Sequence, residues 1–271
     1  MLRGGIGLGV ALWVMALLGP MPASDLYTTR VITSGTAPER RDIGFAQCLR
    51  DVVVKVTGDS RLLNEQALAQ QAKHAGELVA SHTFRDRMGG IPLHDEQGSY
   101  DRPHDLTCVF DPPKLDAFLH TLGREPWLTR PRLVAVVAIR DTKSVESMLA
   151  SDSNGQRDQD MRTALLSAAD RLALPLVVPS QRQLSQAGLV AKTLGSADPA
   201  RLDTLARIAG GDVALVGTLM WSEEDLGWVA NWRTEADGEN HNWGISGVGF
   251  DDAFRNAVAG AAQVLSGHGD P

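Results

Sequence analysis

The one dense group of polar side chains in this chain lies between residues 85 and 105. Imidazole and carboxylate groups bind divalent transition ions, so His94, Asp95, His104 and Asp105 raise the hypothesis of a metal-dependent hydrolase. No His-x-His or His-x3-His spacing supports that hypothesis. A second interpretation is a solvated loop whose shape is held by Arg–Asp pairs, each contributing ~0–1 kcal/mol when exposed.

A third interpretation is a loop that binds a partner protein, and it is the one we predict. Residues 89–103 are rich in glycine, proline and acidic side chains, and they separate two alternating segments typical of a β-hairpin. Loops longer than about a dozen residues are often functional. We predict no catalytic residue, no metal and no cofactor. The predicted contact residues are Arg85, Arg87, His94, Asp95, Glu96, Tyr100 and Arg102.

Three glycine-containing motifs resemble anion-binding loops but are better explained as turns and helix ends. Residues 57–61, TGDSR, and 210–212, GGD, follow predicted helices, where glycine commonly adopts the left-handed conformation. Residues 244–249, GISGVG, lack the lysine and the preceding buried strand of a phosphate loop. The sequence therefore offers no phosphate-binding or nucleophile motif.

Four tryptophans, Trp221, Trp228, Trp232 and Trp243, fall in a predicted meander of three strands. The two-residue period of a strand places Trp228 and Trp232 on one face. An aromatic face with a polar rim could bind a cell-wall sugar, which is an alternative function. The favoured interpretation is packing of the last helix on the sheet, because large aromatic side chains usually belong to a core.

The first residues predict export. A basic start, an apolar run over residues 5–18 and the breaker Gly19-Pro20-Met21-Pro22 before Ala23 are typical of a cleavable signal peptide, residues 1–23. No cysteine follows closely, so we do not expect a lipoprotein, and we expect no integral membrane segment after cleavage. The expected location is the periplasm or the outside of the cell. The net charge of −7 argues against nucleic-acid and anionic-membrane partners.

Cys48 and Cys108 are the only two cysteines. An oxidising compartment favours a disulfide between them. Two buried free thiols remain the alternative, because reduced cysteine is among the most buried residue types.

Periodicity predicts two small α+β domains. For residues 24–125 it gives a β-α-α-β-β-α order: strand 26–33, helices 39–55 and 65–79, strands 80–88 and 104–110, and helix 114–122. Ile43 is expected in the buried stripe of the first helix. Residues 126–132, with two prolines, form the predicted linker.

For residues 133–266 the predicted order is β-α-β-α-β-β-β-α with a mixed sheet. The apolar run 133–139 reads as a strand covered on both faces. The elements that follow are helix 160–173, strand 176–179, helix 181–190, a helix that begins at Asp198 and Pro199, the meander and helix 251–265. Residues 141–157 are expected to be irregular at their end, and 267–271 to form a tail.

Several local motifs resemble the proteobacterial domain-of-unknown-function family 2066. In the first domain they are VKVTGDSRL at 54–62, FRDR at 84–87 and FDP at 110–112. In the second they are PW at 126–127, RPR at 130–132, LPL at 174–176 and DVALVG at 212–217. The resemblance implies an envelope location and brings no activity. The helix, Asp, strand and hairpin of the second domain are also similar to the small α/β domain of curli-secretion, Tol-Pal and flagellar-ring proteins.

These observations predict an uncharacterised exported protein that acts as a non-catalytic envelope assembly or partner-binding factor. Its expected partner is another envelope protein. The sequence leaves its oligomeric state open.

Overall fold

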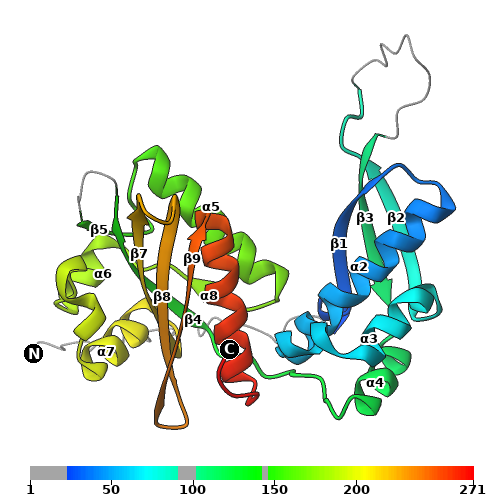
Figure 1. Cartoon of the computed structure of the whole chain (residues 1–271). Coiled ribbons are helices and arrows are strands. Elements are labelled where there is room, and N and C mark those ends of the chain that lie inside the picture. Colours follow the sequence, from blue (N-terminus) through cyan, green and yellow to red (C-terminus); the bar gives the residue numbers. More distant parts are fainter. Residues whose placement is uncertain (1–22, 91–101, 142–145) are drawn as a thin grey trace, which may run out of the picture.

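Two separate β-sheets carry the fold, one on each side of residues 126–132 (Figure 1). The computed structural model describes residues 23–90, 102–141 and 146–271, so the predicted signal peptide falls almost entirely outside the described residues. The mixture of helix and sheet confirms the α+β class.

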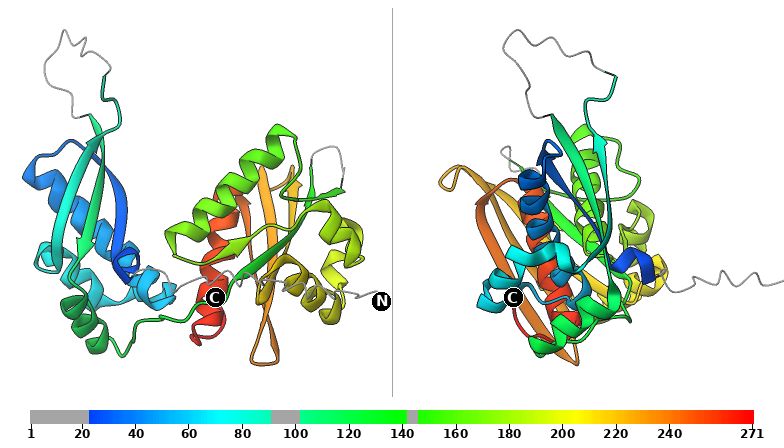
Figure 2. Two further views of the ribbon diagram at one scale, coloured as in Figure 1. Left: turned by 180° about the vertical axis from the view of Figure 1, so that it is seen from behind. Right: turned by 90° about the vertical axis from the view of Figure 1, so that its right-hand side faces the viewer.

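Sheet A has three antiparallel strands in the order β1-β3-β2. They are β1 (Thr28–Ser34), β2 (Val79–Asp86) and β3 (Pro103–Phe110), and the helices are α1 (Ala23–Leu26), α2 (Pro38–Thr57), η1 (Ser60–Asn64), α3 (Gln66–Gln71), η2 (Ala72–Glu77) and α4 (Pro112–Thr121). The right-hand view of Figure 2 shows α2 along one side of the strands. A Cβ atom on Gly44 of α2 would lie 2.5 Å from Leu106 Cδ2 of β3, so the helix approaches the sheet as closely as glycine permits.

Two local expectations for this domain are wrong. Ile43 is 65% exposed. It precedes buried Leu49 by six residues, which places it about 120° away around the helix, at 100° per residue. The predicted helix 65–79 is replaced by α3, which ends at Gln71, and by the 3-10 helix η2, which is kinked at His74 (φ −122°, ψ 23°), and Val79 begins β2.

Cys48 of α2 and Cys108 of β3 form a disulfide, which settles the alternative left open by the sequence. Both residues are fully buried. The bond fixes the middle of α2 to the central strand of sheet A.

Sheet B runs in the order β5-β4-β7-β8-β9, with β6 also paired to β4. β4 is parallel to β6 and β7, while the β7–β8 and β8–β9 pairs are antiparallel, as predicted for a mixed sheet. β5 was missed because it has only three residues, two of them polar. The strands are β4 (Leu133–Arg140), β5 (Glu146–Met148), β6 (Leu176–Val177), β7 (Val213–Ser222), β8 (Gly227–Ala236) and β9 (Glu239–Val248).

Helices cover both faces of β4 in sheet B. Leu133, Ala135 and Val137 pack in the same core as α5 and α8, whereas Val134 and Val136 pack in the core of α6, η3 and α7. Burial on both faces explains the continuous apolar run of β4. The helices are α5 (Gln156–Arg171), α6 (Gln181–Gln186), η3 (Ala191–Ser196), α7 (Pro199–Ala209) and α8 (Phe250–Leu265). Asp198 caps α7 as predicted, accepting a hydrogen bond from the Ala200 amide at 2.9 Å.

Residues 126–132 do more than connect the two halves. The Arg130 guanidinium donates to the carbonyl oxygens of Lys55 and Leu172, at 2.5 Å each, and lies 4.6 Å from the centre of the Trp127 ring. Lys55 belongs to α2, and Leu172 directly follows α5. Burial lowers the pKa of Arg130 to about 10, so the side chain stays charged at neutral pH. One arginine thus joins the two domains through backbone acceptors.

The turn after α2 forms a second contact between the domains. The Asp59 side chain is fully buried and accepts hydrogen bonds from Arg61 Nε and Arg124 Nε, both at 2.9 Å. Burial by itself would raise the pKa of the Asp59 carboxyl. The hydrogen bonds from the two arginines have the larger combined effect in the opposite direction, so the pKa is below 3.8. The hydroxyl of Ser60 donates to Gln263 Oε1 of α8 at 2.6 Å. Gly58 ends α2 at φ +78°, as predicted.

We expect the double substitution C48A/C108A to lower the free energy of unfolding by about 4 kcal/mol. The disulfide closes a long loop and so reduces the conformational entropy of the unfolded chain, and this stabilisation is lost in the variant. The cysteines are 60 residues apart in sequence. Urea unfolding followed by circular dichroism measures the change, and wild-type protein unfolded under strong reductant is the matched control. A loss below about 1 kcal/mol would contradict the assignment of a stabilising role to this bond.

We expect Asp59→Asn to cost about 2 kcal/mol at neutral pH, because it removes the charge-assisted hydrogen bonds that the buried carboxylate accepts from Arg61 and Arg124. The pKa of Asp59 is lower in the folded than in the unfolded chain, so its contribution is present above pH 3.8 and is lost as the pH falls through the folded pKa. The stability gap between wild type and variant should therefore narrow toward pH 2.

Urea titrations at several pH values test this, with the exposed Asp42→Asn as control. A gap that stays constant from pH 7 to pH 2 would show that the charge of Asp59 is not the stabilising feature.

Candidate partner-binding surface

The β2–β3 hairpin presents two chemically different faces. Side chains alternate along a strand, and the cross-strand register shows which of them share a face. Leu106 and Cys108 of β3 point toward α2, because Cys108 is bonded to that helix. The neighbouring residues of β3 and the residues paired with them across the sheet belong to the opposite face, here called the open face. Its members are Arg30 and Ile32 of β1, Thr83 and Arg85 of β2, and Asp105, Thr107 and Val109 of β3.

The open face is accessible. Ile32 at its edge is 60% exposed, and the Arg85 side chain is 73% exposed. Thr83 is also exposed, whereas Thr107 and Val109 on the central strand are half-buried. The open face therefore offers a broad, mostly polar surface with a few aliphatic groups.

A single carboxylate holds two of the predicted contact residues together. Arg85 donates to Asp105 Oδ2 from Nε at 3.1 Å and from Nη2 at 2.5 Å, and Arg87 Nε lies 3.5 Å from Asp105 Oδ1. The hydrogen bond from Arg85 is the main cause that lowers the pKa of Asp105 below its usual value. Asp105 is thus ionised at neutral pH and fixes both guanidinium groups at this end of the sheet.

Arg102 belongs to a separate group on the α2 side of the hairpin. It binds Asp86 Oδ2 at 3.1 Å and the Met88 carbonyl at 3.2 Å. The backbone amide of Met88 donates to Asp86 and is the main cause that lowers the pKa of Asp86. The structure therefore brings together Arg85 and Arg87 but not Arg102, and the predicted residues His94, Asp95, Glu96 and Tyr100 lie outside the described residues.

The metal hypothesis receives no support from the part of the chain that the structure describes. Within residues 23–90, 102–141 and 146–271, no group of three or more His, Cys, Asp or Glu side chains could hold a metal ion. His104 Nδ1 lies 2.8 Å from the Arg102 carbonyl, and Asp105 is bound by arginines. His94 and Asp95 of the proposed set are outside these ranges.

The tryptophans of the meander belong largely to the core between sheet B and α8. Trp232 is 2% exposed, and its ring centre lies 6.0 Å from that of Phe254. Trp228 is buried in the same core, which agrees with the predicted shared face. The indole of Trp243 donates to the Asn256 carbonyl at 3.2 Å. This burial favours the packing interpretation over an aromatic sugar-binding surface.

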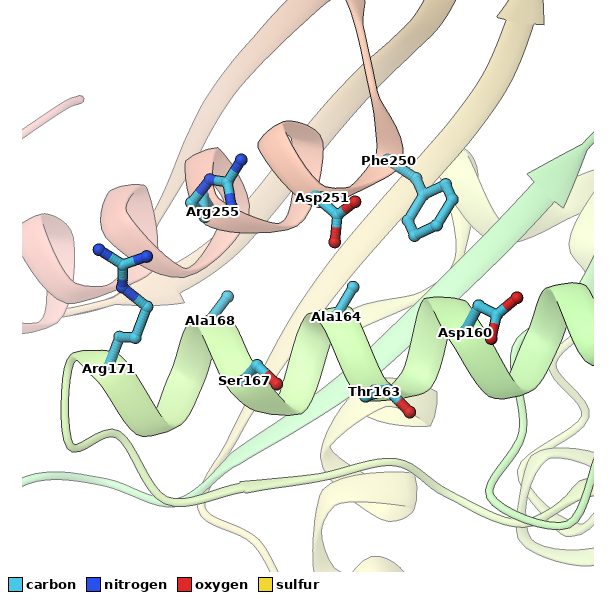
Figure 3. A pocket seen from close by; sticks show the side chains of 9 residues that line it. All are labelled: Asp160, Thr163, Ala164, Ser167, Ala168, Arg171, Phe250, Asp251 and Arg255. Atoms are coloured by element: carbon cyan, nitrogen blue, oxygen red, sulfur yellow. The ribbon is translucent and has the colours of Figure 1, made fainter. Parts of the chain in front are cut away.

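A surface pocket of 310 Å³, which sequence reasoning missed, lies between α5 and α8 (Figure 3). Small residues such as Ala164 and Ala168 line it, and in the sequence they indicate only close helix packing. Arg171 and Arg255 mark one end. Each already has a carboxylate partner, Asp51 at 3.4 Å for Arg171 and Asp252 for Arg255. The hydroxyl of Thr163, which also lines the pocket, donates to the Gln159 carbonyl at 2.9 Å.

Sequence reasoning also missed Ser60 and Arg130 as residues that join the domains. The TGDSR motif was visible in the sequence as a helix end, but nothing in it indicates the distant partners. Gly244 in the GISGVG motif lies within β9, where an added Cβ would be 2.7 Å from the Ala230 carbonyl oxygen, so the glycine serves strand packing.

Comparison with known proteins corrects the family assignment. The sequence model of a protein family described as a domain of unknown function, DUF8605, matches residues 21–128. The resemblance to family 2066 is therefore wrong, because the motifs that suggested it are turns, caps and strand segments that unrelated α+β domains can share.

Among solved structures, the chain is similar to the C-terminal domain of LpoB from Salmonella enterica. The two are 20% identical over 42% of this chain and 82% of that chain, with a TM-score of 0.25, which is too low to carry an argument about fold or function. No curated protein matches the chain. Among the described helices, none has the length and apolar character needed to cross a membrane.

We expect Gly217→Ala to destabilise the protein by about 2 kcal/mol, because a new methyl group must displace a buried indole. The added Cβ would lie 2.0 Å from Trp232 Cζ3. Thermal unfolding measures the effect. Gly195→Ala is the control, since no atom lies within 4 Å of its added Cβ. Equal stability of the two variants would show that Trp232 can move, and would reopen a role for the tryptophans in ligand binding.

Proposed function

We propose that this chain is an exported, non-catalytic protein of the cell envelope that binds another protein through the β2–β3 hairpin. The observation that carries the proposal is the open face of sheet A: α2 covers one face of the hairpin, and the other carries exposed Ile32, Thr83 and Arg85. Figure 1 shows β2 and β3 extending away from the second domain. A partner can therefore reach this surface without displacing another element of the described chain.

Arg85 and Arg87 of the hairpin are already held by ion pairs before a partner binds. Asp105 is 9% exposed and orients both Arg85 and Arg87. Long side chains that are already ordered lose less conformational entropy when a partner binds. This supports recognition by the sheet itself.

The contacts between the domains support the same role. Arg130 links α2 to the end of α5, and Ser60 links the turn after α2 to α8. A fixed arrangement suits a protein that connects or positions other components.

Export is supported by two independent features. The apolar run before Ala23 has the length of a signal-peptide core. The Cys48–Cys108 disulfide lies in a fully buried position, and such bonds persist in oxidising compartments.

The test places a photo-crosslinking amino acid at Ile32 or Thr83 on the open face, in cells that naturally produce the protein. Both positions are exposed, so the substitutions should be tolerated. We expect the same discrete adduct from both, identifiable by mass spectrometry.

Ile43, exposed on α2, is the matched control in the same domain. Absence of adducts from the open face, or identical adducts from Ile43, would contradict binding through this surface.

A further inference from the structure

The open face differs in charge from the rest of the chain. The protein carries a net charge of −7. On and beside the open face, Arg30, Arg85 and Arg87 surround Asp105, and all three guanidinium groups act on the pKa of that carboxyl. Three positive groups against one negative group leave this surface positive. It is therefore complementary to a negatively charged ligand.

The shape and backbone of the sheet favour an extended ligand. Within the described residues, β2 has β3 as its only strand neighbour. The outer N–H and C=O groups of an edge strand can pair with another extended segment. Ile32, Val109 and Thr107 add aliphatic and hydroxyl groups that suit the side chains of a peptide.

The same surface is poorly suited to single-stranded nucleic acid. Proteins that bind it without sequence preference stack bases on aromatic side chains. The aromatic residues of β2, His82 and Phe84, share the α2 side with Cys108 and Leu106 through their register. The ring centres of His82 and of Phe45 in α2 are 5.1 Å apart.

We propose that the open face, together with the outer edge of β2, binds an extended acidic segment of the partner protein. This inference rests on the proposed function, because it specifies the chemistry of the partner at the same surface. Acidic side chains at alternate positions of the segment lie over Arg85 and Arg87, which are two residues apart along and just beyond β2, since alternate residues of an extended chain share one face. Arg30 of β1 adds positive charge to the same face from the far side of β3. The intervening residues point away from the sheet.

The probe is a fluorescein-labelled peptide of about ten residues that alternates Glu and Thr, matching the two-residue period of a strand. Fluorescence anisotropy at low salt measures its binding to the full mature chain. A peptide of the same composition with its glutamates in one block, a Lys–Thr alternating peptide and single-stranded DNA of equal charge are the comparisons. We expect the alternating acidic peptide to bind most tightly and the lysine peptide not to bind.

The variant R30E/R87E reverses two charges while Arg85 stays bonded to Asp105. We expect it to weaken binding of the alternating peptide by about tenfold or more, because the charge pair at Arg87 becomes repulsive and the positive charge that Arg30 adds to the face is reversed. The matched control is R182E/R207E, which makes the same charge change at exposed positions of the second domain and should alter binding by less than about twofold. If R30E/R87E unfolds, R30Q/R87Q replaces it, with a smaller loss in the same direction.

Three results would overturn the inference: no binding of the alternating peptide, equal losses in the two double variants, or DNA and block peptide binding as tightly as the alternating peptide. A partner crosslinked at Ile32 and Thr83 together with any of these results would leave the proposed function standing and reject the acidic segment. Absence of a crosslinked partner would reject the proposed function itself.

Discussion

The packing of α2 against one face of sheet A is the constraint on which the first domain depends. Gly44 lets the helix approach Leu106 as closely as a backbone can, and the Cys48–Cys108 disulfide fixes the helix there. A three-stranded sheet with its main helix on one side buries only that side. The other side must then carry residues that tolerate water, which is why Thr107 stands between buried Leu106 and Cys108 on β3 and why Thr83 and Arg85 on the same face of β2 are exposed.

Sheet B differs from sheet A because helices cover both of its faces. Its strands β4 and β7 are covered on both faces by helices, so their residues are apolar at nearly every position. The tryptophans of the meander contribute to this burial, with Trp232 packed over Gly217. The contrast between the two sheets leaves the accessible sheet face in the first domain and the larger core in the second.

The contacts between the two domains include hydrogen bonds from Arg130 and Ser60 and the packing of Ala173 into the core of the first domain. Arg130 binds backbone carbonyls from both domains, and Asp59 gathers Arg61 and Arg124 beside the end of α8. Because Asp59 is buried, its charge is stabilising only while both arginines are in place. The orientation of the hairpin relative to sheet B therefore depends on electrostatic contacts between residues far apart in sequence.

The sequence by itself determined the features that depend on neighbouring residues. Strand alternation identified β2 and β3, the Asp198-Pro199 pair located the start of α7, and the apolar run of β4 indicated a strand buried on both faces. It also placed Arg85 and Arg87 in the candidate surface. Only the tertiary structure decided that Cys48 and Cys108 are bonded, that Arg102 lies on the other side of the hairpin, and that Ser60 and Arg130 join the domains. Those outcomes require distances between segments tens of residues apart, and local propensity and periodicity contain no information about such distances.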